Sequence, residues 1–470
     1  MNGIFILCYT FRMAEYPKPE TKEVPIPPRW TKAIGVGIVV MGMAMGTGEL
    51  ILWPHLTAKH GLGILWLALV GITLQYFINQ EVARHAAATG ESFFSTSGRI
   101  IRWSPFFWLI AGILLYMWPG WASILGTIAS KLFQTGDYLL WSYVSLGLLL
   151  AITFLGKVAY ATLERSLKII VPVFLVLLVV VSFLNLSGET LGNALAGLVN
   201  FGYIPGDIDI AVLLGAIVFA GAGGMLNLCV SFWYRDKQIA MGAYVDRIEN
   251  PITGKPTASA AHAYQFETTD ENMSRWKGWM RYVRIDQGII FWLLGVISIV
   301  LVSANAVAVL APQGLVPSGV EVATLQAEIF GAQFGALGEK LFLAMAYLML
   351  FAVMWTVVDA LTRIISDILH TNTKVGTRIS IHKLYYSFIV IIVVAQAILL
   401  PMQQPLTFLV ISSVLGGISM AIYTPLLIYA NNTKLPKKIR PNIITNVVMV
   451  FAALFYIYFT YRIILNYFAG

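Results

Sequence analysis

Two glycine-rich stretches decide the fold of this chain: MGMAMGTGEL at residues 41–50 and FAGAGGMLN at residues 219–227. Each lies within an apolar run and holds three glycines, and a glycine inside a helix costs roughly 1 kcal/mol relative to alanine. Glycine clusters at corresponding places in two halves of a membrane protein are typical of paired broken helices in an inverted repeat. The alternative is that the glycines only allow close helix packing, but packing motifs need not recur at matching positions.

The composition around these stretches is that of a membrane protein. Hydrophobic residues make up 58% of the 470 residues and charged residues only 11%, whereas soluble domains carry about 25% charged residues. The sequence therefore predicts an all-α polytopic protein in a lipid bilayer, with about eleven transmembrane helices, of which spans 1 and 6 are broken. The apolar runs lie near 33–56, 62–83, 106–130, 138–156, 165–187, 210–233, 287–311, 341–366, 385–402, 407–430 and 443–467.

Loops rich in Lys and Arg alternate along the chain with loops that are poor in them, which indicates the orientation of the predicted bundle. They are frequent before the first span, in the loop 234–286 and after the tenth span, and sparse in the loops of the opposite side. Because positive residues favour the cytoplasmic side, we expect a cytoplasmic N-terminus. For want of any organelle signal, we expect a prokaryotic plasma membrane. The net charge of +8 follows this topology, so no nucleic-acid partner is expected.

Glu49 lies near the middle of the first span, directly after its glycines. A carboxylate at that depth costs several kcal/mol unless it is paired or hydrated. The functional interpretation is a cation ligand that accepts a proton when the cation leaves. The alternative is a structural pair with a basic residue near the interface, such as Lys59 or His60.

Further residues carry a resemblance to a known family. The second span ends in Ala83-Arg84 and Ala88-Thr89-Gly90, and the sixth span contains Ala222-x-x-Met225. These motifs resemble those of the Nramp family of divalent-metal transporters. The resemblance implies the leucine-transporter fold, with two inverted five-helix repeats, and a carrier that works by alternating access.

The departures from the family pattern concern the metal site. The family's metal-binding Asp falls on Gly46 and its Asn on Glu49, so the carboxylate has moved by about one helical turn. The family's Pro-His after the methionine falls on Leu226-Asn227, and the acidic pair of its third span falls near Gly120 and Ser123. The resemblance therefore implies a substrate site made of Gly46, Thr47, Glu49, Ala222, Met225, Asn227 and Ser413.

The expected organisation has four parts. We expect the Pro-, Lys- and Glu-rich stretch before the first span to be disordered, and Met13 is an alternative start to Met1. The long basic loop is expected to be a small extramembrane element. The four parts are 1–32 (cytoplasmic disordered tail), 33–187 (first five-helix repeat), 210–430 (second five-helix repeat, including the cytoplasmic loop 234–286) and 443–470 (extra C-terminal helix).

The ligand types at the predicted site limit the transported ion. A carboxylate, backbone carbonyls and an amide are hard oxygen ligands, which suit Mg²⁺, Ca²⁺ or Mn²⁺. The thioether of Met225 is softer, and in the family this methionine is implied to select against Mg²⁺ and Ca²⁺, which favours Mn²⁺ or Fe²⁺. The alternative is that Met225 only fills the core, since the chain has 16 methionines.

Other charges fall within or beside the predicted spans. Asp359, Arg363 and Asp367 follow each other at four-residue spacing and so share one helix face. They form either a structural ion cluster or a proton path. Glu81 and Arg84 are expected to be an interfacial pair or an inner gate.

Three functions stay open at this point. The first is a carrier of a divalent metal ion, with or without coupling to H⁺, that needs no cofactor. The second is a carrier of a small organic solute of the same fold, such as an amino acid or amine. The third is a receptor with the loop 234–286 as its output. An enzyme is not expected, because the chain lacks a phosphate-binding loop, a His-Glu-x-x-His motif and a nucleophile elbow. The oligomeric state is not predicted.

Overall fold

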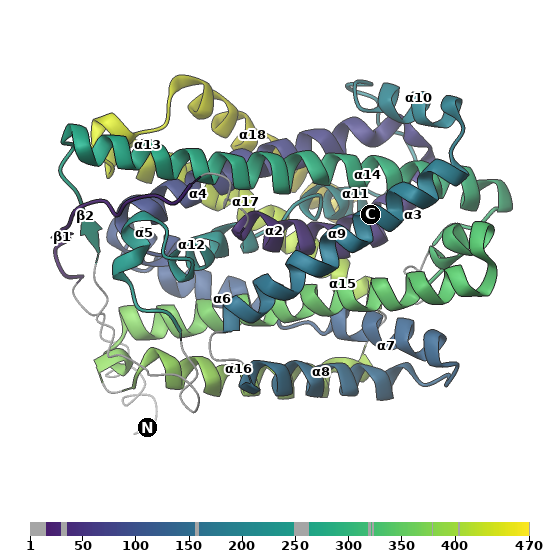
Figure 1. Ribbon diagram of the computed structural model, residues 1–470, viewed down its shortest axis with the longest axis horizontal. Coiled ribbons are helices and arrows are strands. Elements are labelled where there is room, and N and C mark those ends of the chain that lie inside the picture. Colours follow the sequence, from purple (N-terminus) through teal and green to yellow (C-terminus); the bar gives the residue numbers. More distant parts are fainter. Residues whose placement is uncertain are drawn as a thin grey trace.

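The computed structural model describes residues 16–29, 35–155, 159–248, 263–317, 321, 324–377, 379–402 and 405–469. These residues are almost entirely helical, as the sequence predicts, and long helices lie side by side along the longest axis (Figure 1). The two strands that are described, β1 (Glu20–Thr21) and β2 (Tyr264–Gln265), pair in parallel.

The helical elements of the first half are α2 (Val36–Ala44), η2 (Met45–Leu52), α3 (Trp53–His60), η3 (Leu62–Ile64), α4 (Leu65–Thr89), α5 (Phe93–Ile100), α6 (Ser104–Tyr116), α7 (Gly120–Phe133), α8 (Tyr138–Leu155), α9 (Ala159–Asn185) and α10 (Gly188–Gly197). Those of the second half are α11 (Ile210–Val218), α12 (Leu226–Asp236), η4 (Ala240–Tyr244), α13 (Asp270–Ile285), η5 (Asp286–Leu293), α14 (Leu294–Asn305), η6 (Ala306–Leu310), η7 (Ala311–Gln313), α15 (Ala327–Asn372), η9 (Lys374–Thr377), α16 (Ile381–Leu399), η10 (Leu400–Met402), α17 (Pro405–Thr433), η11 (Lys437–Ile439) and α18 (Ile443–Ala469).

Ten helices within the described part are long and apolar enough to cross a membrane, and each matches a predicted run. The remaining predicted run is the sixth, which the structure divides into α11 and α12, of 9 and 11 residues. The buried share of each span shows which spans lie in the centre of the bundle and which lie at its edge. The first span, Val36–His60, is buried along its whole apolar window, whereas only 28% of the window of Tyr138–Leu155 is buried. The interrupted first span therefore lies in the middle of the bundle.

The two predicted interruptions take different forms. The sixth span is broken as expected: residues 219–225 between α11 and α12 are not helical. The first span is not unwound; its glycine-rich stretch forms η2, a π-helical segment within a continuous helix. A π-helical turn keeps most backbone groups hydrogen-bonded, which lowers the cost of the interruption inside a bilayer. Span 3 also bends, between α6 and α7 at Pro119, which was not predicted.

The segment before the first span corrects one expectation. Residues 16–29 were expected to be disordered, but they lie extended against the neighbouring loops and α13. The amides of Glu20 and Lys22 donate to the carbonyls of Ala263 and Gln265, both at 2.9 Å. The indole of Trp279 donates to the carbonyl of Pro25 at 2.8 Å. Disorder is predicted from a low content of apolar side chains. Such a prediction cannot take account of backbone hydrogen bonds to a distant part of the chain, and these hold this segment. Residues 1–15, which include both possible starts, lie outside the described residues.

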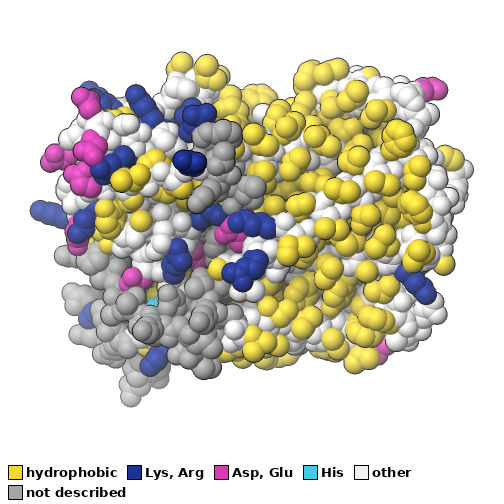
Figure 2. Space-filling view, in the orientation of Figure 1, with side chains coloured by type: hydrophobic (Ala, Val, Ile, Leu, Met, Phe, Trp, Pro, Cys, Tyr) yellow, Lys and Arg dark blue, Asp and Glu magenta, His cyan; other side chains and the backbone are white. Residues whose placement is uncertain are grey.

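The surface agrees with a membrane-embedded bundle. Hydrophobic side chains cover the centre and right of the face in Figure 2, whereas Lys, Arg, Asp and Glu gather at the left. The left end is the one that holds β1, β2, α5 and the start of α13 (Figure 1). We call it the N-terminal end of the bundle. A protein that crosses a bilayer exposes apolar side chains to the lipid chains and keeps its charged side chains outside the hydrocarbon layer, as this surface does.

Candidate functional site at the interrupted spans

The break in span 6 is a non-helical turn made possible by glycine. Helix α11 ends at Val218, and Gly223 and Gly224 follow with φ values of 84° and 57°. Residues with a Cβ atom rarely adopt these positive φ angles, so the double glycine permits the turn that leads into α12. The sequence predicts the position of this break but not the side chains that hold it.

Three neutral side chains from other spans bind the polar backbone groups of the break. The amide nitrogen of Gln75, on α4, donates to the carbonyls of Ile217 and Val218 at 3.1 and 2.9 Å. The hydroxyls of Tyr116 and Tyr423 donate to the carbonyls of Gly223 and Gly224, each at 3.1 Å. These residues therefore replace the hydrogen bonds that an unbroken helix would make, as a buried backbone requires.

Asn227, at the start of α12, joins this network. Its amide nitrogen donates to the side-chain oxygen of Gln75 at 3.3 Å and to the hydroxyl of Tyr423 at 3.2 Å. Its own side-chain oxygen is fully buried and has no hydrogen-bond partner. A hydrogen-bond acceptor of this kind at the break is available to a donor or a cation.

The π-helical segment of span 1 lies directly against the break. The carbonyl oxygen of Phe219 would be 2.0 Å from a Cβ atom placed on Gly48, so only glycine fits there. Gly46 faces α15, where a Cβ atom would come within 2.2 Å of Val353. The two glycines thus allow span 1 to pack closely against the break and against α15. In addition, π-helical turns are frequent at functional sites.

Glu49 is fully buried and points to a third neighbour, α14. Its carboxyl oxygen Oε1 lies 3.9 Å from where a Cβ atom of Gly295 would be, and the hydroxyl of Ser298 faces the carboxyl group. Neither carboxyl oxygen has a formed hydrogen bond, and neither has the Ser298 hydroxyl. The interfacial pairing with Lys59 or His60 is not seen: His60 pairs instead with Asp207, at 3.6 Å.

The other predicted site residues are spread around the break. Ala222 lies within it, and Met225, which precedes α12, is fully buried. Ser413, on α17, donates to the carbonyl of Val410 at 2.8 Å and packs against Gly215, before the break. The structure therefore brings Gly48, Ala222, Met225 and Asn227 to one junction, with Glu49 on its α14 side. The side chain of Thr47 lies outside the described residues.

The three charged residues of span 8 form two separate sets of ion pairs, one around Arg363 and one at Asp367. Arg363 bonds Asp359 through Nε at 2.7 Å and Asp236 through Nη1 at 2.7 Å. Asp367 pairs with Arg235, at 3.2 Å, and accepts from the hydroxyl of Ser92 at 2.6 Å. These contacts join α15 to α12 and to Ser92 at the start of α5.

The pair of Glu81 and Arg84 belongs to the same end of the bundle. Arg84 Nε donates to Glu81 Oε1 at 2.9 Å, and its Nη1 donates to the carbonyl of Ile439 at 3.1 Å. The amide of Asn431 donates to Glu81 Oε2 at 2.8 Å. The pair thus ties α4 to α17 and to the turn that precedes α18.

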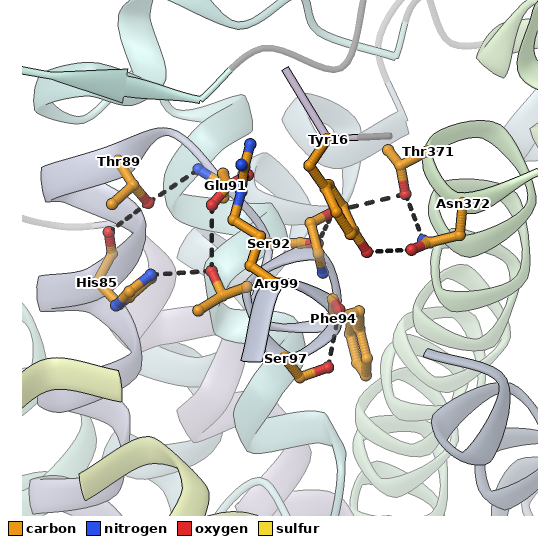
Figure 3. A network of polar contacts seen from close by, with 12 residues as sticks. Tyr16, His85, Thr89, Glu91, Ser92, Phe94, Ser97, Arg99, Thr371 and Asn372 are labelled. Atoms are coloured by element: carbon orange, nitrogen blue, oxygen red, sulfur yellow. Dashed lines mark hydrogen bonds and ion pairs between the residues drawn. The ribbon is translucent and has the colours of Figure 1, made fainter. Parts of the chain in front are cut away.

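Figure 3 shows a further polar network at this end, where Tyr16 from the N-terminal segment meets α5 and α15. Its hydroxyl donates to Asn372, and the guanidinium of Arg99 lies 4.9 Å from the centre of its ring. Arg99 also bonds Glu91, with Nε 2.7 Å from Oε1. Burial raises the pKa of the Glu91 carboxyl above its usual range, and Arg99 offsets part of this rise.

The residues that brace the break were missed by the sequence interpretation. Gln75 is a polar residue within the apolar run of α4, and such residues in spans are a functional signal that could have drawn attention to it. Tyr116 and Tyr423 give no such signal, because tyrosine is common in membrane proteins.

The fold can be compared with solved structures, whereas no protein-family model and no curated protein matches the sequence. A manganese transporter of Eremococcus coleocola, bound to an aromatic bis-isothiourea substituted compound, is similar with a TM-score of 0.66 at 14% identity, over 96% of this chain and 91% of that chain. Mhp1, a nucleobase-cation-symport-1 family transporter, is similar with a TM-score of 0.55 at 15% identity, over 90% and 83%. At these identities the likeness is one of fold. The chain is an integral membrane protein with the leucine-transporter fold.

Proposed function

We propose that this protein is a secondary transporter that works by alternating access and carries a divalent metal cation. One observation supports this most: a fully buried carboxylate without a formed hydrogen bond, that of Glu49, lies beside a broken span. Burying an unpaired carboxylate is costly, and a bound cation removes that cost. Discontinuous helices at the middle of a membrane are where carriers of this fold bind their substrates and ions.

The groups around the break favour a cation over an anion. The unpaired oxygens of Glu49 and Asn227 are acceptors, and they lie on the two interrupted spans. Hard oxygen ligands suit Mg²⁺, Ca²⁺ and Mn²⁺, and a thioether from Met225 would shift the preference towards Mn²⁺ or Fe²⁺. The likeness in fold to a manganese transporter supports the same class of substrate.

A second candidate substrate is a small organic solute such as an amino acid or amine. The observation in its favour is the neutral character of the break, which Gln75, Tyr116 and Tyr423 surround with amide and phenol groups. The described residues also contain no group of three or more His, Cys, Asp or Glu side chains that could hold a metal. A single carboxylate would balance the single charge of an amine.

Uptake into proteoliposomes distinguishes these substrates. We expect saturable Mn²⁺ uptake by the wild type and its loss in Glu49→Gln, which keeps the shape of the side chain and removes its charge. Glu189→Gln is the matched control, because Glu189 is an exposed acid on α10, and it should transport as the wild type does. Absence of Mn²⁺ flux in a folded wild type, together with flux of an amine or amino acid, would replace the first candidate by the second.

A further inference from the structure

One continuous helix runs from the N-terminal end into the membrane, through α13, η5 and α14 (Figure 1). Between Ser274 and Ile297, its exposed side chains recur mostly at steps of three or four residues, as an α-helix requires for one face. The single step of five residues falls where the π-helical η5 begins, and the wider π-helical turn absorbs the additional residue. These side chains are Ser274, Lys277, Arg281, Arg284, Ile289, Leu293 and Ile297.

The chemistry of this face changes in layers along the helix. Acidic residues occupy the first turn, at Asp270 and Glu271. The basic residues follow, from Lys277 to Arg284, and they are exposed. The apolar residues come last, and Ile289 is still 50% exposed. Arg284 and Ile289 are five residues apart, so the change from basic to apolar takes roughly 7 Å along the axis.

The bilayer explains these layers. The exposed apolar side chains, Ile289, Leu293 and Ile297, belong to a span and face lipid chains. Basic groups within one or two turns of such a stretch lie at the level of the headgroups, where their long side chains reach the phosphates. The acids of the first turn lie furthest from the membrane, so they do not repel an anionic headgroup at close range.

We propose that this face is a binding surface for an anionic phospholipid, formed by Lys277, Arg281 and Arg284 for the headgroup and by Ile289 and Leu293 for the first part of the acyl chains. A molecule that touches both layers must have a negative head and an apolar body. A soluble acidic protein could contact the basic residues but not Ile289 and Leu293, which lie within the membrane span. Arg284 is fixed to its own helix, because its Nε donates to the carbonyl of Met280 at 3.2 Å.

Lipid-dependent thermal unfolding of the full chain in detergent tests the proposal. We expect added phosphatidylglycerol to raise the Tm of the wild type and phosphatidylcholine to have little effect. The variant K277Q/R281Q/R284Q should need at least roughly tenfold more phosphatidylglycerol for half of the maximal shift, since each basic residue near the surface contributes about fivefold to binding. Its Tm without lipid should stay close to that of the wild type.

A matched control separates this surface from a general effect of charge. The variant K434Q/K437Q/K438Q removes three exposed positive charges from the turn before α18, and it should keep the wild-type lipid dependence. An equal loss in both triple variants would overturn the proposal, because net charge alone would then explain the binding. Equal stabilisation by soluble glycerol phosphate would overturn it as well, since the apolar layer would then contribute nothing.

Discussion

Gly48 of span 1 is in direct backbone contact with Phe219, the first residue of the break in span 6. The carbonyl oxygen of Phe219 would lie 2.0 Å from a Cβ atom on Gly48, a distance that no side chain tolerates. The two interruptions are therefore one structural feature: Gly48 leaves the π-helical segment without a side chain at the point where the backbone of the break meets it.

The first prediction follows from this contact. Gly48→Ala should sharply lower the yield of folded protein, because the new methyl group meets backbone atoms that cannot rotate away. Gly147→Ala is the matched control, since Gly147 lies in span 4 with open space around it, and it should fold normally. Size-exclusion profiles of the two variants provide the measurement. Equal profiles would show that the segments separate easily.

The second prediction concerns the amide that braces the break. Gln75→Leu keeps the size of the side chain but leaves the carbonyls of Ile217 and Val218 without this donor. Each buried group left unsatisfied costs about 1–3 kcal/mol, so the Tm in detergent should fall by several degrees. Gln333→Leu, at an exposed position of α15, should leave the Tm almost unchanged. A similar small effect for both would mean that Gln75 is dispensable.

The third prediction tests the ion cluster of span 8. Arg363→Met should destabilise the protein by about 3–5 kcal/mol, because Asp236 and Asp359 then lose their shared positive partner in a buried position. The triple variant R363M/D236N/D359N removes the stranded charges and should recover most of the lost stability. Failure of the triple variant to recover would indicate that Arg363 acts through packing rather than through charge.

The fourth prediction is a pH dependence of stability. The raised pKa of Glu91 means that the folded state binds this proton more tightly than the unfolded state. Its contribution to stability is therefore largest at low pH, and it is lost as the pH rises from the ordinary carboxyl pKa through the folded pKa. The Tm of the wild type should therefore fall as the pH rises through this range, and Glu91→Gln should remove this fall. Parallel pH profiles of the two proteins would contradict the assignment.

The fifth prediction addresses the N-terminal segment. The buried side-chain oxygen of Asn272 accepts from the amide of Val24 at 3.0 Å. Asn272→Ala should release the segment and speed tryptic cleavage after Lys22, as followed by mass spectrometry. Asn200→Ala, which removes an exposed amide at the other end of the bundle, should leave the rate unchanged. Equal rates in both variants would show that Asn272 does not hold the segment.

Particular residues show where sequence reasoning worked and where it could not. The glycines at 221, 223 and 224 mark a break that the structure confirms, because the conformational preference of glycine is local. The glycines at 42, 46 and 48 also mark an interruption, but its π-helical form depends on the neighbours that Gly46 and Gly48 contact. The bracing by Tyr116 and Tyr423 could not be predicted, since it joins spans that are far apart in the chain.

The sequence by itself determined the membrane class, the positions of the spans and the two places where a span is interrupted, because hydropathy and glycine content act over short stretches of chain. Only the tertiary structure decided which way Glu49 points, what holds the break and where residues 16–29 lie. Each of these depends on a partner from a distant part of the chain, and the contact forms only when the helices pack. The direction of Glu49 towards Gly295 of α14 is the clearest case, because the sequence of span 1 is the same whichever neighbouring helix this side chain faces.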